Sequence, residues 1–184
     1  MKRLLLSVAL ATASICSEAA DFKLFSPEIK ANSMMPSSFE FNSFGCTGLN
    51  KSPALKWAGA PKETKSFAVT VYDPDAPTGS GWWHWMMFNI PAGVTELVAG
   101  AGDVNSTTLP PGATQNRIDY GFAAWGGTCP PKGDKPHRYV FTVYALKTDK
   151  IEVPADATAA LTGYMIKGNA IAKASFTAKY GRAK

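Results

Sequence analysis

The sequence predicts a mostly β protein, an antiparallel β-sandwich with a C-terminal helix and a final short strand. Several short runs are rich in β-branched and aromatic residues, which suit a pleated and packed surface. Turn-forming residues, among them 13 prolines and 16 glycines, separate these runs. One stretch near the C-terminus has helical period. Together these observations favour two packed sheets with one helix against them.

Five runs are predicted as strands: residues 39–41, 55–57, 66–72, 85–90 and 139–146. The last three are the longest and contain the most β-branched and aromatic side chains. Residues 100–124 are polar and contain few strand formers, so they predict a long crossover loop.

The helix is expected after Pro154, on one apolar face spaced at i, i+4, i+7 and i+11: Leu161, Met165, Gly168 and Ala172. Gly163 and Gly168 each disfavour a helix by about 1 kcal/mol relative to alanine, so the helix depends on docking. Residues 176–180 are expected to form the final strand.

The first twenty residues have the pattern of a signal peptide, and residues 21–184 would form the single domain. Lys2 and Arg3 precede an apolar run at residues 4–13, and Ser17-Glu18-Ala19 is a small-x-small cleavage site. Cleavage near Ala20 would deliver the protein to the periplasm. The run is too short to span a bilayer, so no integral membrane segment is expected. Two alternatives are a lipoprotein acylated on Cys16 and a buried N-terminal strand or helix.

The remaining chain is long enough to bury a core and is mildly basic. The whole sequence has a net charge of +5; without Lys2, Arg3 and Glu18 it keeps 17 basic and 13 acidic residues, a net charge of +4. No run of five basic residues occurs, so nucleic-acid binding is not expected. The mild positive charge favours anionic partners in general.

Two cysteines remain after such processing, Cys46 and Cys129. An even pair in an oxidising compartment is most simply a disulfide. Both residues lie in glycine-rich polar stretches that offer no apolar shelter, which argues against the alternative of two separate buried thiols.

Both histidines of the chain directly precede or begin predicted strands. His84 lies in Gly-Trp-Trp-His-Trp at residues 81–85, and His137 precedes the strand that starts at Tyr139. Asp73 ends another strand and begins Asp-Pro-Asp-Ala-Pro. Proline would keep this run extended and place Asp73 and Asp75 on one side. Strand ends cluster at one rim of a sandwich, so these groups could share a site. A solvated turn with acidic caps is the alternative for the acidic run.

These motifs resemble the two signature regions of the phosphatidylethanolamine-binding (Raf-kinase-inhibitor-like) family, in particular its bacterial branch. The resembling features are Asp-Pro-Asp-Ala-Pro, Trp-x-His at a strand start, and Gly-x-x-Pro-Pro-x-Gly followed by His-Arg-Tyr. The resemblance implies a pocket for phosphate or a phospholipid head group such as phosphoethanolamine. Its expected ligand-binding residues are Asp73, Asp75, Trp82, His84, Gly127, Pro130, His137 and Tyr139. Cys129 stands where relatives often have a small residue, so a disulfide to Cys46 would covalently fix the rim of the pocket.

The chemistry of these residues is compatible with anion binding. Imidazole N–H groups, the Tyr139 hydroxyl and backbone N–H groups of the glycine-rich segment could donate to an anion. Asp73 and Asp75 could fix a histidine tautomer or receive an ammonium group. In a solvent-open pocket, His84→Ala should nearly abolish binding and leave stability almost unchanged.

A non-enzymatic binding protein without cofactor or metal is therefore the main prediction, and two other classes stay open. Gly79-Ser80-Gly81 does not match a nucleophile elbow. His84, His137 and an aspartate could bind a metal or act in acid–base catalysis, but their spacing follows no local zinc motif. An inhibitor or modulator of a protein partner, such as a protease, is the other alternative.

Overall fold

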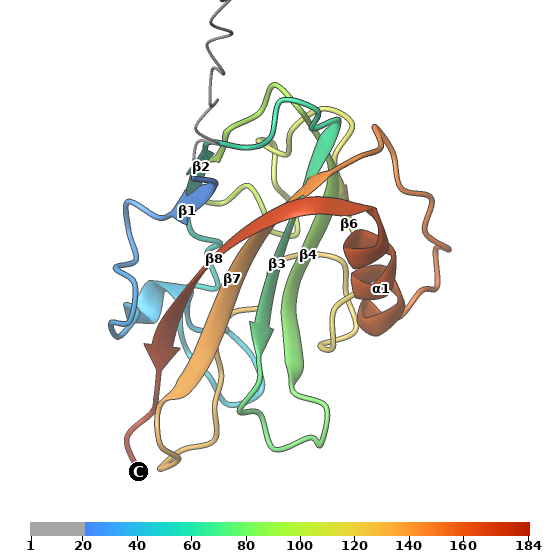
Figure 1. Ribbon diagram of the computed structural model, residues 1–184. Coiled ribbons are helices and arrows are strands. Elements are labelled where there is room, and N and C mark those ends of the chain that lie inside the picture. Colours follow the sequence, from blue (N-terminus) through green and yellow to red (C-terminus); the bar gives the residue numbers. More distant parts are fainter. Residues whose placement is uncertain (1–20) are drawn as a thin grey trace, which may run out of the picture.

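The computed structural model describes residues 21–184, which form two antiparallel sheets and one α-helix (Figure 1). The strands are β1 (Lys23–Phe25), β2 (Leu55–Ala58), β3 (Ser66–Asp73), β4 (Trp82–Pro91), β5 (Glu96–Leu97), β6 (Thr114–Gln115), β7 (His137–Leu146) and β8 (Ala170–Tyr180). The helices are the short 3-10 helix η1 (Ser37–Phe39) and α1 (Ala159–Asn169). The predicted mostly β class with a C-terminal helix and a final strand is confirmed. The expected signal peptide lies outside the described residues.

The larger sheet has five strands in the order β6-β4-β3-β7-β8, and the smaller has three in the order β1-β2-β5. In the larger sheet β3 is antiparallel to both β4 and β7. The end of β3 therefore lies beside the beginnings of β4 and β7, as predicted for the rim. In Figure 1 the β3–β4 connection, the segment before β7 and the C-terminus all lie at this end of the sheet.

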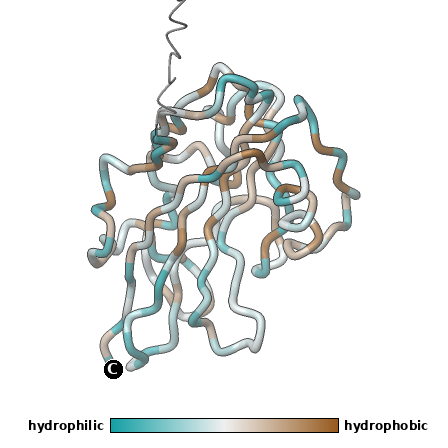
Figure 2. The backbone as a smooth tube through the Cα atoms, viewed as in Figure 1, coloured by the Kyte–Doolittle hydropathy of each residue, from teal (hydrophilic) through white to brown (hydrophobic). Residues whose placement is uncertain are grey.

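Side chains that alternate along the strands fill two separate core regions. One side of β3 and β7 packs against the smaller sheet through residues such as Val69, Phe141 and Trp57. The other side packs under α1 through Ala68, Met86 and Ile166. Apolar segments accordingly concentrate inside the strands, whereas the rim is largely hydrophilic (Figure 2). In residues 21–184, no helix is long and apolar enough to cross a membrane.

The structure corrects the prediction for residues 39–41. Phe39 ends the η1 turn, and Glu40 makes only an isolated bridge to Thr128. Phe39 and Phe41 are nevertheless buried, which explains their apolar pattern. The expected crossover at residues 100–124 is mostly irregular but includes the short strand β6.

The predicted helix is present, but its buried face was wrong. Leu161 is exposed, and Ala172 belongs to β8. The buried residues of α1 are Ala159, Thr162, Gly163 and Ile166. Gly163 lies against β4: a Cβ atom there would be in ordinary van der Waals contact with the Trp83 ring, at 3.6 Å. The final strand is longer than predicted, because β8 begins directly after α1.

Candidate functional site

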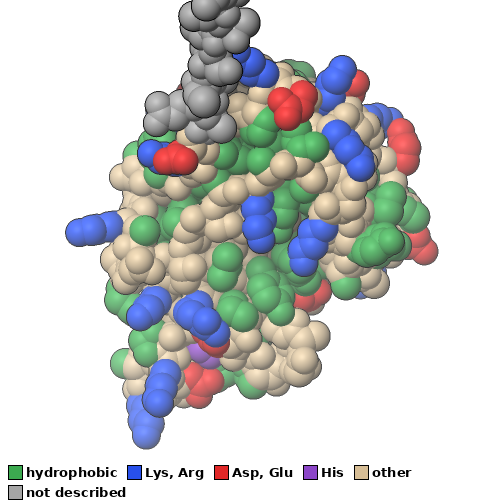
Figure 3. Space-filling view, viewed as in Figure 1, with side chains coloured by type: hydrophobic (Ala, Val, Ile, Leu, Met, Phe, Trp, Pro, Cys, Tyr) green, Lys and Arg blue, Asp and Glu red, His purple; other side chains and the backbone are tan. Residues whose placement is uncertain are grey.

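A cavity of about 270 Å3 opens at the rim where β3 ends and β4 and β7 begin. Histidine, acidic and basic side chains are visible together at this end of the molecule (Figure 3). The lining residues come from strand ends and loops: Phe44, Asp73, Ala76, Pro77, Thr78, Trp82, His84, Tyr120, Cys129, Pro130, Pro131, His137, Tyr139 and Arg182.

The structure brings six of the eight expected pocket residues together: Asp73, Trp82, His84, Pro130, His137 and Tyr139. Asp75 and Gly127 are not in the lining. Asp75 points to Arg138 on the outside of the rim, and Gly127 lies behind the wall of the cavity.

A β-bulge places His84 in the cavity. Tyr72 pairs with Trp83 and Val71 pairs with Trp85, so His84 has no partner of its own on β3. The extra residue breaks the alternation of β4, because a bulge redirects side chains locally. Trp82 and His84 line the cavity and Trp83 packs on the α1 side, so the break comes after His84: the next residue, Trp85, lies in the core between the two sheets.

The hydrogen bonds of His84 define the tautomer of its ring. Its Nδ1 lies 2.7 Å from the Gly126 carbonyl oxygen and 3.1 Å from that of Gly127. Carbonyl oxygens only accept, so Nδ1 carries a proton and donates. Burial lowers the pKa of His84, against the opposing effect of these two bonds. His84 is 2% exposed, so we no longer expect His84→Ala to leave stability unchanged.

The Gly126–Gly127 backbone can reach His84 because neither residue has a side chain. A Cβ atom on Gly127 would lie 2.5 Å from the Phe39 carbonyl oxygen and 2.5 Å from the Phe41 nitrogen. The N–H groups of this segment are already engaged, with Gly126 donating to the His84 carbonyl and Gly127 to Asn50 Oδ1. They do not serve as the anion donors that the sequence indicated.

Asp73 caps a turn instead of lying parallel to Asp75 in an extended segment. Its Oδ1 accepts the backbone N–H groups of Asp75 (2.8 Å) and Ala76 (3.1 Å), which is the acidic-cap alternative. Its Oδ2 accepts from His137 Nδ1 at 2.8 Å. The expected role of an aspartate in fixing a histidine tautomer is therefore observed for this pair.

His137 is held between two carboxylates. Its Nδ1 faces Asp73, and its Nε2 lies 3.5 Å from Asp134 Oδ2. Both ring nitrogens thus face acidic groups of the protein, and His137 contributes its ring to the wall of the cavity.

Asp75 forms a bidentate pair with Arg138 at 2.6 and 2.9 Å and also accepts the Arg138 backbone N–H. These hydrogen bonds from Arg138 hold the pKa of Asp75 at about 2. The carboxylate fastens the β3–β4 turn to β7.

Two donors in the cavity lining have no partner. The Tyr139 hydroxyl and Trp82 Nε1 are buried, and neither forms a hydrogen bond of normal geometry with residues 21–184, although the Asp73 carboxylate lies near the Tyr139 hydroxyl. Burial raises the pKa of Tyr139 and the Asp73 carboxylate contributes to the rise, so the hydroxyl keeps its proton. Buried polar groups without partners are rare, which makes these two the clearest binding feature of the cavity.

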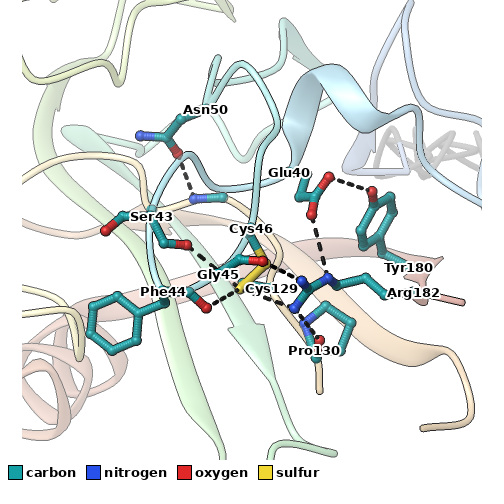
Figure 4. The surroundings of a disulfide bond; sticks show 12 residues. Glu40, Ser43, Phe44, Gly45, Cys46, Asn50, Cys129, Pro130, Tyr180 and Arg182 are labelled. Carbon is teal, nitrogen blue, oxygen red and sulfur yellow. Dashed lines mark hydrogen bonds and ion pairs between the residues drawn. A yellow bond between two sulfur atoms is a disulfide. The ribbon is translucent and has the colours of Figure 1, made fainter. Parts of the chain in front are cut away.

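Another part of the cavity wall comes from two loops joined by the Cys46–Cys129 pair. Cys46 and Cys129 lie at disulfide distance, with 1.94 Å between the sulfur atoms and 5.9 Å between the Cα atoms, as the sequence predicted. Cys129 and Pro130 line the cavity beside Phe44. Figure 4 shows that the side chain of Arg182 lies against the same wall.

Sequence reasoning missed Arg182. Its guanidinium donates to the carbonyl oxygens of Pro130 and Gly45, and its Nε lies 3.5 Å from Glu40 Oε1. Glu40 also accepts from Tyr180, and the pKa of that tyrosine rises to about 12 through burial and this carboxylate. Arg182 is in no motif; only its position just after the last strand could have indicated a role at the rim.

Tyr120 was also missed, because it lies in the segment expected to be a polar crossover. Its ring stacks on Phe41 at 4.2 Å and meets the ring edges of Trp82 and His84 at 5.2 and 5.6 Å. Its hydroxyl donates to the Gly127 carbonyl. Among residues 21–184, no group of three or more histidine, cysteine or acidic side chains has a metal-binding arrangement.

The fold and the rim cavity define a β-sandwich binding protein, and sequence comparison identifies its family. The chain belongs to the phosphatidylethanolamine-binding protein family, whose profile matches residues 25–181. The resemblance seen in the signature motifs is confirmed.

The similar proteins include the bacterial branch that the motifs indicated. The chain is 55% identical to the Escherichia coli protein YbcL over 180 residues, which cover 98% of each chain. It is 44% identical to E. coli YbhB over 158 residues, 86% of this chain and 99% of YbhB.

Solved structures support the same relationship. The crystal structure of E. coli YbcL matches with a TM-score of 0.85 and 57% identity, covering 88% of this chain and 99% of YbcL. A Chlamydia trachomatis homologue, CT736, matches with a TM-score of 0.73 and 27% identity, covering 90% of this chain and 99% of CT736.

Proposed function

We propose that this chain is an exported, non-enzymatic binding protein whose rim cavity takes a small oxyanion, such as phosphate or the head group of a phospholipid. The observation that carries the proposal is the pair of unpartnered donors, Tyr139 hydroxyl and Trp82 Nε1, in one cavity of about 270 Å3.

A ligand oxygen at these donors would remove an energetic cost that the free protein bears. Leaving one buried polar group without a partner costs about 1–3 kcal/mol, and a hydrogen bond to a charged group contributes about 1.5–3 kcal/mol. The buried Asp73 carboxylate is already satisfied by two backbone N–H groups and His137, which reduces its repulsion of an anion. We expect weak binding, because a single small group must still be desolvated and ordered.

The contacts of the cavity side chains support a role without catalysis. His137 and Asp73 form the orienting pair of a nucleophile site, but Asp134 faces the other ring nitrogen where a nucleophile would stand. The Thr78 hydroxyl donates to the Gly81 carbonyl, and the Cys129 sulfur is paired with Cys46.

Export is supported by the charged and apolar pattern of residues 1–20 and by the Cys46–Cys129 pair, which suits an oxidising compartment. Pairs of this kind are uncommon in reducing compartments.

The oxyanion proposal is tested by calorimetric titration of wild type and Trp82→Phe with phosphate and phosphoethanolamine. Wild type should bind both, and the variant should bind about tenfold more weakly, because one charge-assisted hydrogen bond is lost. Trp57→Phe is the matched control, since Trp57 also has an unpartnered buried indole N–H but lies in the core between the sheets. Absence of heat with wild type, or equal losses in both variants, would overturn the proposal.

A further inference from the structure

The cavity presents one acceptor as well as two donors. Because His84 Nδ1 donates to two carbonyl oxygens, a neutral ring leaves Nε2 with a lone pair and no proton. No residue from 21 to 184 donates a hydrogen bond to Nε2, and the faces and edges around the ring are those of Tyr120 and Tyr139. Nε2 is therefore the nitrogen that remains for a ligand.

Burial favours this neutral state of His84. The ring is almost completely removed from solvent, and burial lowers its pKa. The negative charge of Asp73 opposes that effect, and Asp119 does so more weakly. The unliganded cavity then combines the donors Tyr139 hydroxyl and Trp82 Nε1 with the acceptor His84 Nε2.

Such a set distinguishes oxyanions by whether they carry a proton. Hydrogen phosphate at neutral pH, and a phosphate monoester as its monoanion below its second pKa of about 6, can accept from Tyr139 and Trp82 through their charged oxygens and donate a P–O–H to His84. Sulfate is fully deprotonated at neutral pH, so one of its oxygens would face the Nε2 lone pair. A phosphodiester has no P–O–H either. When a site is built to form a hydrogen bond with its ligand, an analogue that cannot form that bond leaves a buried polar group of the protein unpaired and binds much more weakly.

We propose that the cavity selects oxyanions that bring their own proton, so that hydrogen phosphate and phosphate monoesters bind in preference to sulfate and phosphodiesters, with His84 Nε2 as the selecting acceptor. This inference rests on the proposed oxyanion function and narrows its ligand class. The natural ligand is then a free phosphate or monoester, and an intact phospholipid, whose phosphate is a diester, binds less well.

The selectivity is measured by calorimetric titration of the disulfide-bonded protein with two matched pairs of ligands, the inorganic pair at pH 7 and the ester pair at about pH 5, where a monoester keeps one P–O–H. The first pair is inorganic phosphate and sulfate. The second is phosphoethanolamine and glycerophosphoethanolamine, which separates a soluble monoester from the diester linkage of a lipid head group. We expect the protonated member of each pair to bind at least about tenfold more tightly, because the other member leaves His84 Nε2 opposite an oxygen lone pair.

Two variants test the role of the acceptor, His84 Nε2, separately from the role of the donors. In His84→Gln a side-chain amide can present an N–H to the ligand, so the ratio between phosphate and sulfate should fall toward one. In Tyr139→Phe both anions lose the same donor, so both should weaken while their ratio stays as in wild type. If His84→Gln does not fold, the wild-type affinity ratios of phosphate to sulfate and of monoester to diester alone test the proposal.

The outcomes distinguish this inference from the proposed function. Equal binding of phosphate and sulfate, or tighter binding of the diester, overturns the selectivity and leaves the oxyanion cavity standing. No binding of any of the four ligands overturns both.

Discussion

At the scale of single residues, two kinds of polar side chain line the cavity: those that already have hydrogen-bond partners within the protein and those that do not. The Asp73 carboxylate accepts three hydrogen bonds, and His137 faces a carboxylate at each ring nitrogen. These residues are fixed by the protein itself. Tyr139 and Trp82 are buried in the same wall with donors that have no protein partner. Ligand binding is therefore expected to be most sensitive to substitution of Tyr139 and Trp82.

Tyr139→Phe should weaken phosphate binding by about tenfold and leave the free energy of unfolding unchanged or slightly raised. The hydroxyl makes no hydrogen bond of normal geometry with residues 21–184, so its removal breaks none and relieves the cost of an unsatisfied buried group. Titration calorimetry and urea denaturation measure the two effects. Tyr164→Phe, on the exposed side of α1, should change neither quantity. A marked loss of stability in Tyr139→Phe would show that its hydroxyl has a structural partner.

Asp75→Asn should lower the free energy of unfolding by about 1 kcal/mol at pH 7, because the pair with Arg138 is partly exposed to solvent. Arg138 holds the pKa of Asp75 at about 2, below its usual 3.8. A depressed pKa stabilises the fold above about pH 4, and this contribution is lost as the pH falls toward 2. Urea denaturation at pH 7, 4 and 2 should show the difference from wild type disappear. Asp149→Asn, at an exposed position, should show no such change. A difference that persists at pH 2 would contradict the ion-pair explanation.

At the scale of secondary-structure elements, α1 buries a face made mostly of small residues. Gly163 lies against Trp83 and Met86, and Ile166 is fully buried about one turn later. Leu161, which has the larger apolar side chain, faces outward and is 41% exposed. The helix thus docks by its small residues.

Ile166→Ala should lower the free energy of unfolding by about 2–4 kcal/mol, because it leaves a cavity in the core under α1. Leu161→Ala should change it by less than about 1 kcal/mol, since much of that side chain is already in water. Equilibrium denaturation of both variants gives the comparison. Equal losses would mean that the helix docks on the face the sequence indicated.

The loops that carry Cys46 and Cys129 form one wall of the cavity. The two cysteines are 83 positions apart, and a loop of that length makes a disulfide stabilising by up to about 4 kcal/mol. Cys46→Ser combined with Cys129→Ser should therefore lower the free energy of unfolding by about 2–4 kcal/mol. Phosphate should also bind more weakly, because Cys129 and Pro130 line the cavity. Wild type in reductant should match the variant in both measurements; if wild type does not respond to reductant, the proposed effect of the disulfide is refuted.

At the scale of the whole molecule, the sequence predicted the sandwich because strand-forming residues and turn residues alternate strongly along the chain. It also placed Asp73, His84 and His137 at one rim, since strand ends meet there. It failed where a local geometry depends on the fold. The hydrogen bonds of the His84 ring, of the Asp75 carboxylate and of the Arg182 guanidinium each involve partners more than forty residues away. No local pattern records such contacts.

Export involves the whole chain, because it determines both where the fold begins and whether the cysteines can pair. If the signal peptide is removed on export, the mature protein should begin at Ala20 or Asp21, just before β1. Expressed in E. coli from Met1, it should be recovered from the periplasm with the mass of this shortened chain less two hydrogens. Replacing Lys2 and Arg3 by glutamate should leave uncleaved precursor, because the positive n-region is part of the signal. The same domain expressed from Asp21 in the reducing cytoplasm should instead contain two alkylatable thiols. Recovery of the abundant species with Met1 at its N-terminus, or of periplasmic protein with both thiols free, would contradict this prediction.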